Sequence, residues 1–298
     1  MSKAPAKLAL PKLVLPRTRD LGGFSVRRVL PAPDQRAVGP FVFFDHIGPV
    51  TFAPGQGIDV APHPHIGLAT VTYLFEGEFV HRDSLGSLQP IRPGDVNWMT
   101  AGRGIVHSER TAPEQRGAGP RLHAVQSWLA LPKDHEDCAP AFHHHPAATL
   151  PLFSKDDVEI RVIAGHAYGY RSPVRVFSET LYVDARMPAR SRLRLPGEHA
   201  ERAVYVATGG VSAFGHAIPA ERLAVFAAGD DVIVTAETDS RIVVLGGAPL
   251  DGPRIVWWNF VASRNDRIEQ AKERWRANGF GTIPGETERI PLPDQGPA

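Results

Sequence analysis

Two pairs of side chains in this sequence could bind one metal ion together. The first pair is His63 and His65, and the second pair, further along the chain, is His107 and Glu109. Each pair lies in a stretch that the sequence indicates to be extended, and side chains two positions apart on a strand point to the same face. Two such faces, brought together, would offer three imidazole nitrogens and one carboxylate to a single ion.

This donor set favours a divalent transition metal of borderline softness. Imidazole and carboxylate suit iron, manganese, cobalt, nickel, copper and zinc, whereas magnesium and calcium prefer sites built from oxygen. The set lacks the thiolates that are typical of structural zinc sites. It would leave coordination positions for water, a substrate or dioxygen, and it is similar to the facial triad of two histidines and one carboxylate with one histidine added.

The elements that position these residues are predicted to be short strands. Glycine and proline number 28 each, so turns are frequent, which favours an all-β chain. Within residues 24–130, apolar runs such as 41–44 and 68–75 alternate with turn sequences at roughly ten-residue spacing, as in a sandwich or barrel. The helical spacing of apolar residues predicts one helix over residues 264–278.

A weak internal repeat predicts two copies of one β-domain. Residues 71–77 resemble residues 204–209, and residues 92–95 resemble residues 227–230. The ligand positions of the first copy then fall near residues that cannot bind a metal ion, which are Leu195, Gly197, Ile242 and Val244. We therefore expect the second copy to keep the scaffold without the site, and one metal ion per chain.

The composition along the chain predicts where these domains begin and end. We expect an N-terminal metal-binding domain over residues 1–138 and a C-terminal domain over residues 158–298, which ends in the helix and a tail. Between them, residues 139–157 are rich in proline and charge and are predicted to be a linker.

Charge and apolar content exclude several classes of partner. The formal net charge is +1, from 33 basic and 32 acidic residues, which offers no footprint for direct nucleic-acid binding. Cys138 is the only cysteine, so no intrachain disulfide can form. No apolar stretch approaches the roughly 20 residues that cross a bilayer, and the proline-rich start is a poor signal peptide. We expect a cytoplasmic protein with no membrane partner.

The region around the four candidate ligands resembles the pirin family of bicupins. Gly57 stands six residues before His63, in the order of the first cupin motif. The most specific match is residues 98–109, with the sequence WMTAGRGIVHSE. Further matches are Phe43-Phe44-Asp45, Glu76-Gly77, Arg82-Asp83-Ser84, Pro93-Gly94-Asp95 and Gln126-Ser127-Trp128-Leu129. The resemblance extends over most of the chain and is strongest over residues 20–130.

The resemblance implies a fold and a metal site. It implies two antiparallel β-barrel domains of the jelly-roll type, packed face to face, with one metal ion in the N-terminal barrel. The residues matching its ligands are His63, His65, His107 and Glu109. The family's ion is usually iron, so Fe(II) is expected first, with Cu, Mn, Co, Ni or Zn as alternatives. General cupins carry a further glutamate where this chain has Ala69 or Thr70, so Glu109 is the only carboxylate identified in the site.

Two different functions are compatible with this resemblance. Some members are quercetin 2,3-dioxygenases, so one hypothesis is a metal-dependent dioxygenase that cleaves flavonols such as quercetin with dioxygen. The animal member acts as a transcription co-regulator, so the alternative is a metal- and redox-sensitive regulatory protein that binds a protein partner. A third possibility is a metal that only stabilises the barrel.

The dioxygenase hypothesis assigns roles to further residues. Glu109 is the candidate general base as well as a ligand. Phe44, Trp98 and Met99 are candidate walls of a pocket for a flat aromatic substrate, although each is equally compatible with plain barrel core. His81 follows a predicted hairpin and is interpreted as an exposed strand histidine, with a position behind the metal ligands as the alternative.

Overall fold

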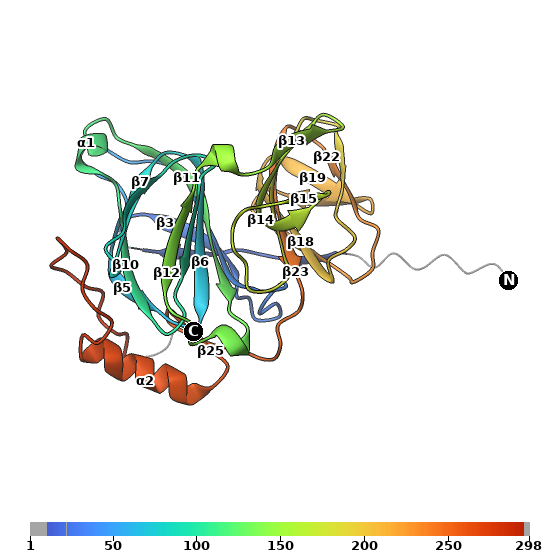
Figure 1. Cartoon of the computed structure of the whole chain (residues 1–298). Helices are drawn as coiled ribbons and strands as arrows, with labels where there is room; N and C mark the ends of the chain where they lie inside the picture. The colour runs from blue at the N-terminus through green and yellow to red at the C-terminus, as the bar shows by residue number, and fades with distance from the viewer. Residues whose placement is uncertain (1–10, 22, 295–298) are drawn as a thin grey trace. The chain divides into compact units, whose positions relative to one another are not determined.

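The computed structural model describes residues 11–21 and 23–294, which form two compact units (Figure 1). The histidine unit comprises residues 18–28, 41–149 and 250–294, and the apolar unit comprises residues 11–17, 29–40 and 150–249. Both units consist mainly of antiparallel strands, which confirms the all-β prediction. Among the described residues, no helix is long and apolar enough to cross a membrane.

Two antiparallel sheets build the histidine unit over its described residues. The larger sheet has the order β12 (Ala141–His145), β9 (Val96–Thr100), β6 (Leu68–Glu76), β11 (Arg121–Ala130), β4 (Phe41–Thr51), β3 (Ser25–Leu30) and β2 (Arg17–Asp20). The smaller sheet has the order β5 (Asp59–His65), β10 (Ile105–Arg110), β7 (Phe79–Asp83) and β8 (Leu88–Ile91). The short helical turns of the histidine unit are α1 (Pro113–Arg116), η1 (Lys133–His135) and η2 (Ala147–Thr149).

The apolar unit has the same pair of sheets in its described part. Its larger sheet has the order β1 (Lys12–Val14), β21 (Leu223–Phe226), β18 (Glu201–Thr208), β23 (Ser240–Gly247), β16 (Thr180–Met187), β14 (Val158–Ala167) and β13 (Leu152–Lys155), with β15 (Tyr170–Arg171) paired to β14. Its smaller sheet has the order β17 (Arg192–Arg194), β22 (Ile233–Ala236), β19 (Gly210–Ala213) and β20 (His216–Pro219). The predicted repeat is therefore real at the level of topology.

The predicted correspondence between residues 92–95 and residues 227–230 is wrong by one hairpin. Gly94 precedes β9, whereas Gly229 follows β21, and β9 and β21 occupy the same place in their sheets. Short turns with glycine and aspartate recur at many hairpins, so they do not specify which hairpin is which. Ile242 and Val244 consequently lie on β23, the counterpart of β11, and not on β22, the counterpart of β10.

The apolar unit nevertheless has no ligands at the matching strands. The strands β17 and β22, which correspond to β5 and β10, contribute apolar side chains to a buried core cluster, among them Leu193, Val234 and Ala236. Apolar side chains thus occupy the place that histidines occupy in the histidine unit. The second copy therefore keeps the scaffold and lacks the ligands, as predicted, but the residues at the ligand positions are not the ones that the sequence comparison named.

The predicted domain boundaries differ from these units. Residues 139–157 are not a linker, because they contain β12, which pairs with β9, and β13, which pairs with β14. Both strands are at the edge of a sheet, where neighbouring prolines do not interrupt the hydrogen-bond ladder. The many prolines of this edge segment resemble those of a linker, which explains the wrong prediction. The first strand, β1, pairs with β21 of the apolar unit, and residues 250–294 belong to the histidine unit.

The C-terminal segment packs against the strands that carry the candidate ligands. It forms a hairpin of β24 (Ile255–Trp257) and β25 (Phe260–Ala262), followed by α2 (Asn265–Arg276), the predicted helix, which lies next to β25 (Figure 1). One face of α2 is buried in a cluster that includes Ile66 and Val106. Because Ile66 follows His65 and Val106 precedes His107, this cluster fixes the ends of β5 and β10.

Candidate metal centre

The candidate ligands lie on two neighbouring antiparallel strands, β5 and β10. In their register His107 is opposite His63, and a bulge between His107 and Glu109 shifts the pairing. Such bulges redirect side chains beside functional sites. In β5 the histidines alternate with Pro62 and Pro64, and β5 is an edge strand, where proline is tolerated.

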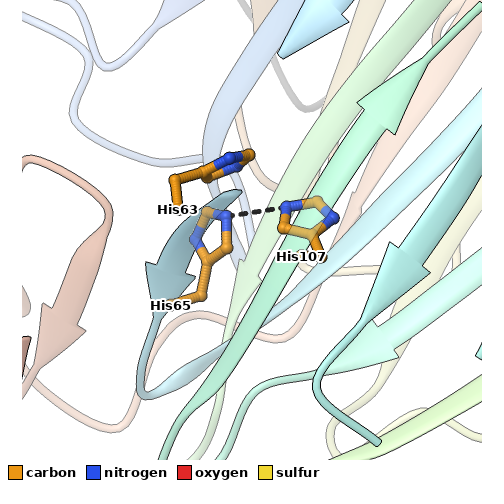
Figure 2. A group of neighbouring side chains, drawn as sticks. All are labelled: His63, His65 and His107. Atoms are coloured by element: carbon orange, nitrogen blue, oxygen red, sulfur yellow. Dashed lines mark hydrogen bonds between the residues drawn. The ribbon is translucent and has the colours of Figure 1, made fainter. Parts of the chain in front are cut away.

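The three histidines converge on one point (Figure 2). One ring nitrogen from each lies within 4.8 Å of those of the others, and Nε2 of His65 is 3.1 Å from Nε2 of His107. All three side chains are buried. The predicted spacing of His63, His65 and His107 therefore does bring these residues together.

Hydrogen bonds to backbone carbonyls fix two of the imidazole rings. Nδ1 of His63 donates to the carbonyl of Ala61 at 2.9 Å, and Nδ1 of His65 donates to the carbonyl of Asn259 at 3.1 Å. A carbonyl oxygen can only accept, so the proton of each neutral ring is on Nδ1. The lone pair of each ring is then on Nε2, the atom available to a metal ion.

The third ring, that of His107, is fixed by side chains. Nδ1 of His107 is 3.3 Å from Nδ1 of His81, and Nε2 of His81 donates to Oδ2 of Asp83 at 2.9 Å. Oδ1 of Asp83 accepts hydrogen bonds from the backbone N–H groups of Leu85 and Ser87. His107 is thus connected to a carboxylate through a second histidine.

Burial keeps the three candidate ligands neutral. Desolvation lowers the pKa of His63 to about 4, and it lowers the pKa of His65 and His107 well below 6.5, with repulsion between the rings adding to it. A metal ligand must be the unprotonated imidazole, so no proton competes at these rings near pH 7. The cluster fits a divalent transition ion, because two nitrogens 3.1 Å apart can both lie about 2.1 Å from one ion.

Glu109 lies beside this cluster but is not part of the converging set. Its Oε1 accepts hydrogen bonds from Nε2 of Gln126 at 3.1 Å and from Oγ1 of Thr72 at 3.3 Å. Burial raises its pKa from 4.5 to about 7, although these two hydrogen bonds act in the opposite direction. Its role as a fourth ligand therefore remains a prediction.

A cavity of about 300 Å³ opens onto this site. Its lining includes His63, His65 and Glu109, and the other lining residues are Leu21, Arg28, Phe43, Asp45, Val60, Gln126, Trp128, Trp258, Asn259 and Ile290. The rings of Phe43 and Trp128 stack at a centroid distance of 3.8 Å with an interplanar angle of 10°. The guanidinium of Arg28 lies 4.4 Å from the centre of the Phe43 ring. The cavity is thus lined by a stacked aromatic pair beside a histidine cluster.

Comparison with known proteins decides the family. The sequence model of pirin matches residues 23–129, and the model of the pirin C-terminal cupin domain matches residues 182–281. The chain belongs to the pirin family. Both units are cupin domains, so the bicupin prediction is confirmed.

Relatives and solved structures cover nearly the whole chain. A pirin-like protein of Caulobacter vibrioides is 48% identical over 283 residues, covering 93% of this chain and 97% of the relative. Human pirin is 33% identical over 278 residues, covering 90% of this chain and 92% of the relative. The crystal structure of a quercetin 2,3-dioxygenase from Acinetobacter baumannii superposes with a TM-score of 0.88 at 37% identity, covering 96% of this chain and 97% of the other.

The predicted pocket residues do not line the cavity of this pirin-family chain. Directly opposite residues of antiparallel strands share a face, and in this sheet Phe44 and Trp98 share a face with Ser127, not with Trp128. They therefore lie on the side of the sheet away from the cavity. Met99 shares the face of Trp128 but is two strands away and is not among the lining residues.

Of the two readings of His81, the exposed strand histidine is wrong, because in this pirin-family chain His81 is buried against His107. The alternation of β7 could have shown this. Phe79, His81 and Asp83 are buried, whereas the two residues between them are partly exposed, so all three point to the same inner face.

A second group of histidine and glutamate side chains lies in the apolar unit of the pirin fold. His166, Glu198 and His199 offer ligand atoms within 4.8 Å of one another. Both nitrogens of His199 are already used, since Nδ1 is hydrogen-bonded to Oε1 of Glu179 at 2.9 Å and Nε2 donates to the carbonyl of His166 at 3.0 Å. The ring nitrogens of His199 are therefore already engaged, unlike Nε2 of His63 in the histidine cluster.

Proposed function

We propose that this chain is a metal-dependent dioxygenase of the pirin type that cleaves flavonols such as quercetin at a single metal centre. The observation that carries the proposal is the buried cluster of His63, His65 and His107, beside a cavity that a stacked aromatic pair lines. The similarity to a quercetin 2,3-dioxygenase over 96% of the chain supports it.

The proposed metal site consists of these three histidines and Glu109. A divalent ion held there would act as a Lewis acid and lower the pKa of a flavonol hydroxyl group. We infer Fe(II) as the first candidate, and Cu, Mn, Co, Ni and Zn have the same preference for nitrogen and oxygen ligands.

The protein's own groups would bind the substrate and move its proton. The ring edges of the stacked pair Phe43 and Trp128 would provide an apolar contact for the substrate in the cavity. Glu109 lines the cavity and is the group that would accept a proton from the substrate hydroxyl. Gln126 and Thr72 hold its carboxylate by Oε1 beside the site. Burial of the histidines limits water at the reacting atoms.

Turnover of quercetin tests this proposal. Protein loaded with Fe(II) under argon and then exposed to oxygen should consume quercetin and dioxygen in equal amounts and release carbon monoxide. The His63→Ala variant should neither consume quercetin and dioxygen nor release carbon monoxide. The His199→Gln variant, altered in the apolar unit, should consume quercetin at the wild-type rate. If the loaded wild-type protein left quercetin and related flavonols unchanged under oxygen, the proposal would fail.

The alternative of a regulatory protein that binds a protein partner stays a prediction. The described residues offer no feature that favours a particular partner, whereas the cavity beside the histidines favours a small molecule. The cytoplasmic location likewise remains a prediction.

A further inference from the structure

The three histidines of the proposed metal site differ in how their rings are fixed. His63 and His65 donate to backbone carbonyls, which no substitution can remove directly. His107 instead contacts the side chain of His81, which in turn contacts Asp83. The tautomer of His107 therefore depends on side chains, and a substitution can change it.

The carboxylate of Asp83 sets the direction of this chain of hydrogen bonds. Its Oδ1 accepts from the N–H groups of Leu85 and Ser87 at 2.9 and 3.1 Å, and its Oδ2 is 2.9 Å from Nε2 of His81. Because Oδ1 already accepts two N–H groups, Asp83 acts as an acceptor on both oxygens, and Nε2 of His81 is the donor.

The direction then passes from His81 to His107. A His81 ring with its single proton on Nε2 has its lone pair on Nδ1, and this atom can accept from Nδ1 of His107, which is 3.3 Å away. His107 consequently has its own lone pair on Nε2, the atom 3.1 Å from Nε2 of His65. All three ligand nitrogens of the site are thus available at the same time.

The surrounding fold holds this arrangement in place. On the neighbouring strands β7 and β10, Asp83 is opposite His107 and His81 is opposite Glu109, so the side chains share one face. The ring of His81 stacks on Phe142 at a centroid distance of 4.2 Å and an angle of 11°. The side chains of His81, Asp83 and His107 are all buried, so water does not compete for these hydrogen bonds.

We propose that Asp83 and His81 are positioning residues that hold the proton of His107 on Nδ1 and so keep Nε2 free to bind the metal ion. This inference rests on the metal site of the proposed function, but it does not depend on which substrate is bound. Partners of this kind orient metal-binding histidines and raise their basicity, and their loss typically costs 10- to 100-fold in metal affinity.

The isosteric variant Asp83→Asn should reverse the chain of hydrogen bonds. The amide oxygen can still accept from Leu85 and Ser87, so the amide NH₂ group is turned toward His81 and donates to it. His81 must then carry its proton on Nδ1 and donate to His107, whose own proton moves to Nε2. A proton on that nitrogen blocks the lone pair that the ion needs.

Metal titration and nitrogen NMR together test the proposal. Metal-free protein is titrated with Co(II) under argon, and the imidazole ¹⁵N shifts of His107 are recorded separately with one equivalent of diamagnetic Zn(II), because without a metal ion Nε2 of His107 can donate to Nε2 of His65. We expect Asp83→Asn to bind Co(II) about 10- to 100-fold more weakly than wild type. We also expect its His107 to show the Nε2–H tautomer, whereas the wild-type protein, with Nε2 on the metal ion, shows Nδ1–H. A merely structural role for Asp83 would not exchange the two ¹⁵N signals.

Two further variants keep the test decisive. His81→Phe keeps a ring against Phe142 and removes the acceptor, so it should also lose at least about tenfold in Co(II) affinity. Asp59→Asn is the matched control, because Asp59 is on β5 and pairs with Arg116 without touching a ligand, and it should bind Co(II) as wild type does.

The possible failures are distinguishable. If Asp83→Asn keeps the Nδ1–H tautomer, or if either variant binds Co(II) within about twofold of wild type, the positioning role is wrong while the metal site stands. If Asp83→Asn does not fold, the His81→Phe result decides alone. If wild type itself binds no Co(II), both the metal site and this inference fail.

Discussion

Replacing Glu109 by glutamine should stabilise the metal-free protein at alkaline pH. Burial raises the pKa of Glu109 from 4.5 to about 7, and its Oε1 accepts hydrogen bonds that a glutamine oxygen can also accept. At ~1.4 kcal/mol per pH unit, a pKa higher by about 2.5 corresponds to about 3 kcal/mol of free energy of unfolding. Glutamine has the same shape and no charge to bury, so the variant avoids this cost.

The sign of the effect follows from the direction of the shift. A carboxyl whose pKa is raised on folding contributes stability that is complete below pH 4.5 and is lost as the pH rises through about 7. The lowered pKa of the buried histidines has the opposite effect between about pH 4 and 6.5, but the difference between wild type and Glu109→Gln cancels it. The free energy of unfolding of the variant, relative to that of wild type, should rise by about 3 kcal/mol from pH 4.5 to pH 8 and then remain constant.

Urea unfolding followed by tryptophan fluorescence measures this difference for the relevant unit alone. All five tryptophans lie in the histidine unit, so the signal reports on the domain that contains Glu109. Glu286→Gln is the control, because the pKa of Glu286 is lowered and its difference from wild type should be flat between pH 5 and 8. A Glu109→Gln difference that is equally flat would refute the reasoning that burial raises this pKa.

Three further outcomes follow from other contacts of the histidine unit. Glu286→Gln should lower the free energy of unfolding at pH 7 by about 1–3 kcal/mol, because its carboxylate accepts hydrogen bonds from Nε and from one NH₂ group of Arg110. The loss should shrink below pH 4.5, where the wild-type carboxylate becomes protonated. Gly67→Ala should destabilise by more than ~1 kcal/mol in the same assay, since Gly67 has φ +68° and a Cβ there would lie 2.0 Å from the carbonyl oxygen of Val261. Trp128→Leu should raise the KM for quercetin about fivefold with unchanged metal content, because it removes the stacked wall; an unchanged KM would count against that wall.

The candidate ligand cluster was predictable because its residues come in closely spaced pairs of metal-binding side chains. His63 and His65 are two residues apart on one strand, so alternation places them on the same face, and the family resemblance implied that His107 joins them from the neighbouring strand. The all-β class and the helix near the C-terminus followed from turn frequency and helical spacing. These features depend on local sequence, which a single chain displays directly.

The features that the sequence did not reveal depend on long-range packing. The carbonyl of Asn259 orients His65, but a carbonyl is present at every residue and has no sequence signature. Phe43 and Phe44 are adjacent and both apolar, so the sequence does not indicate which one faces the cavity. The prediction named Phe44, whereas the residue that lines the cavity is Phe43. The return of residues 250–294 to the first domain could not be read from composition either.

Metal content per chain is the most direct test of the central claim. Protein purified without chelators and analysed for bound metal should contain one transition-metal ion per chain. His107→Ala should contain almost none, and His199→Gln, altered in the other histidine group, should contain as much as wild type. Full metal content in folded His107→Ala, or loss of the metal in His199→Gln, would contradict the assignment of the site to His63, His65 and His107.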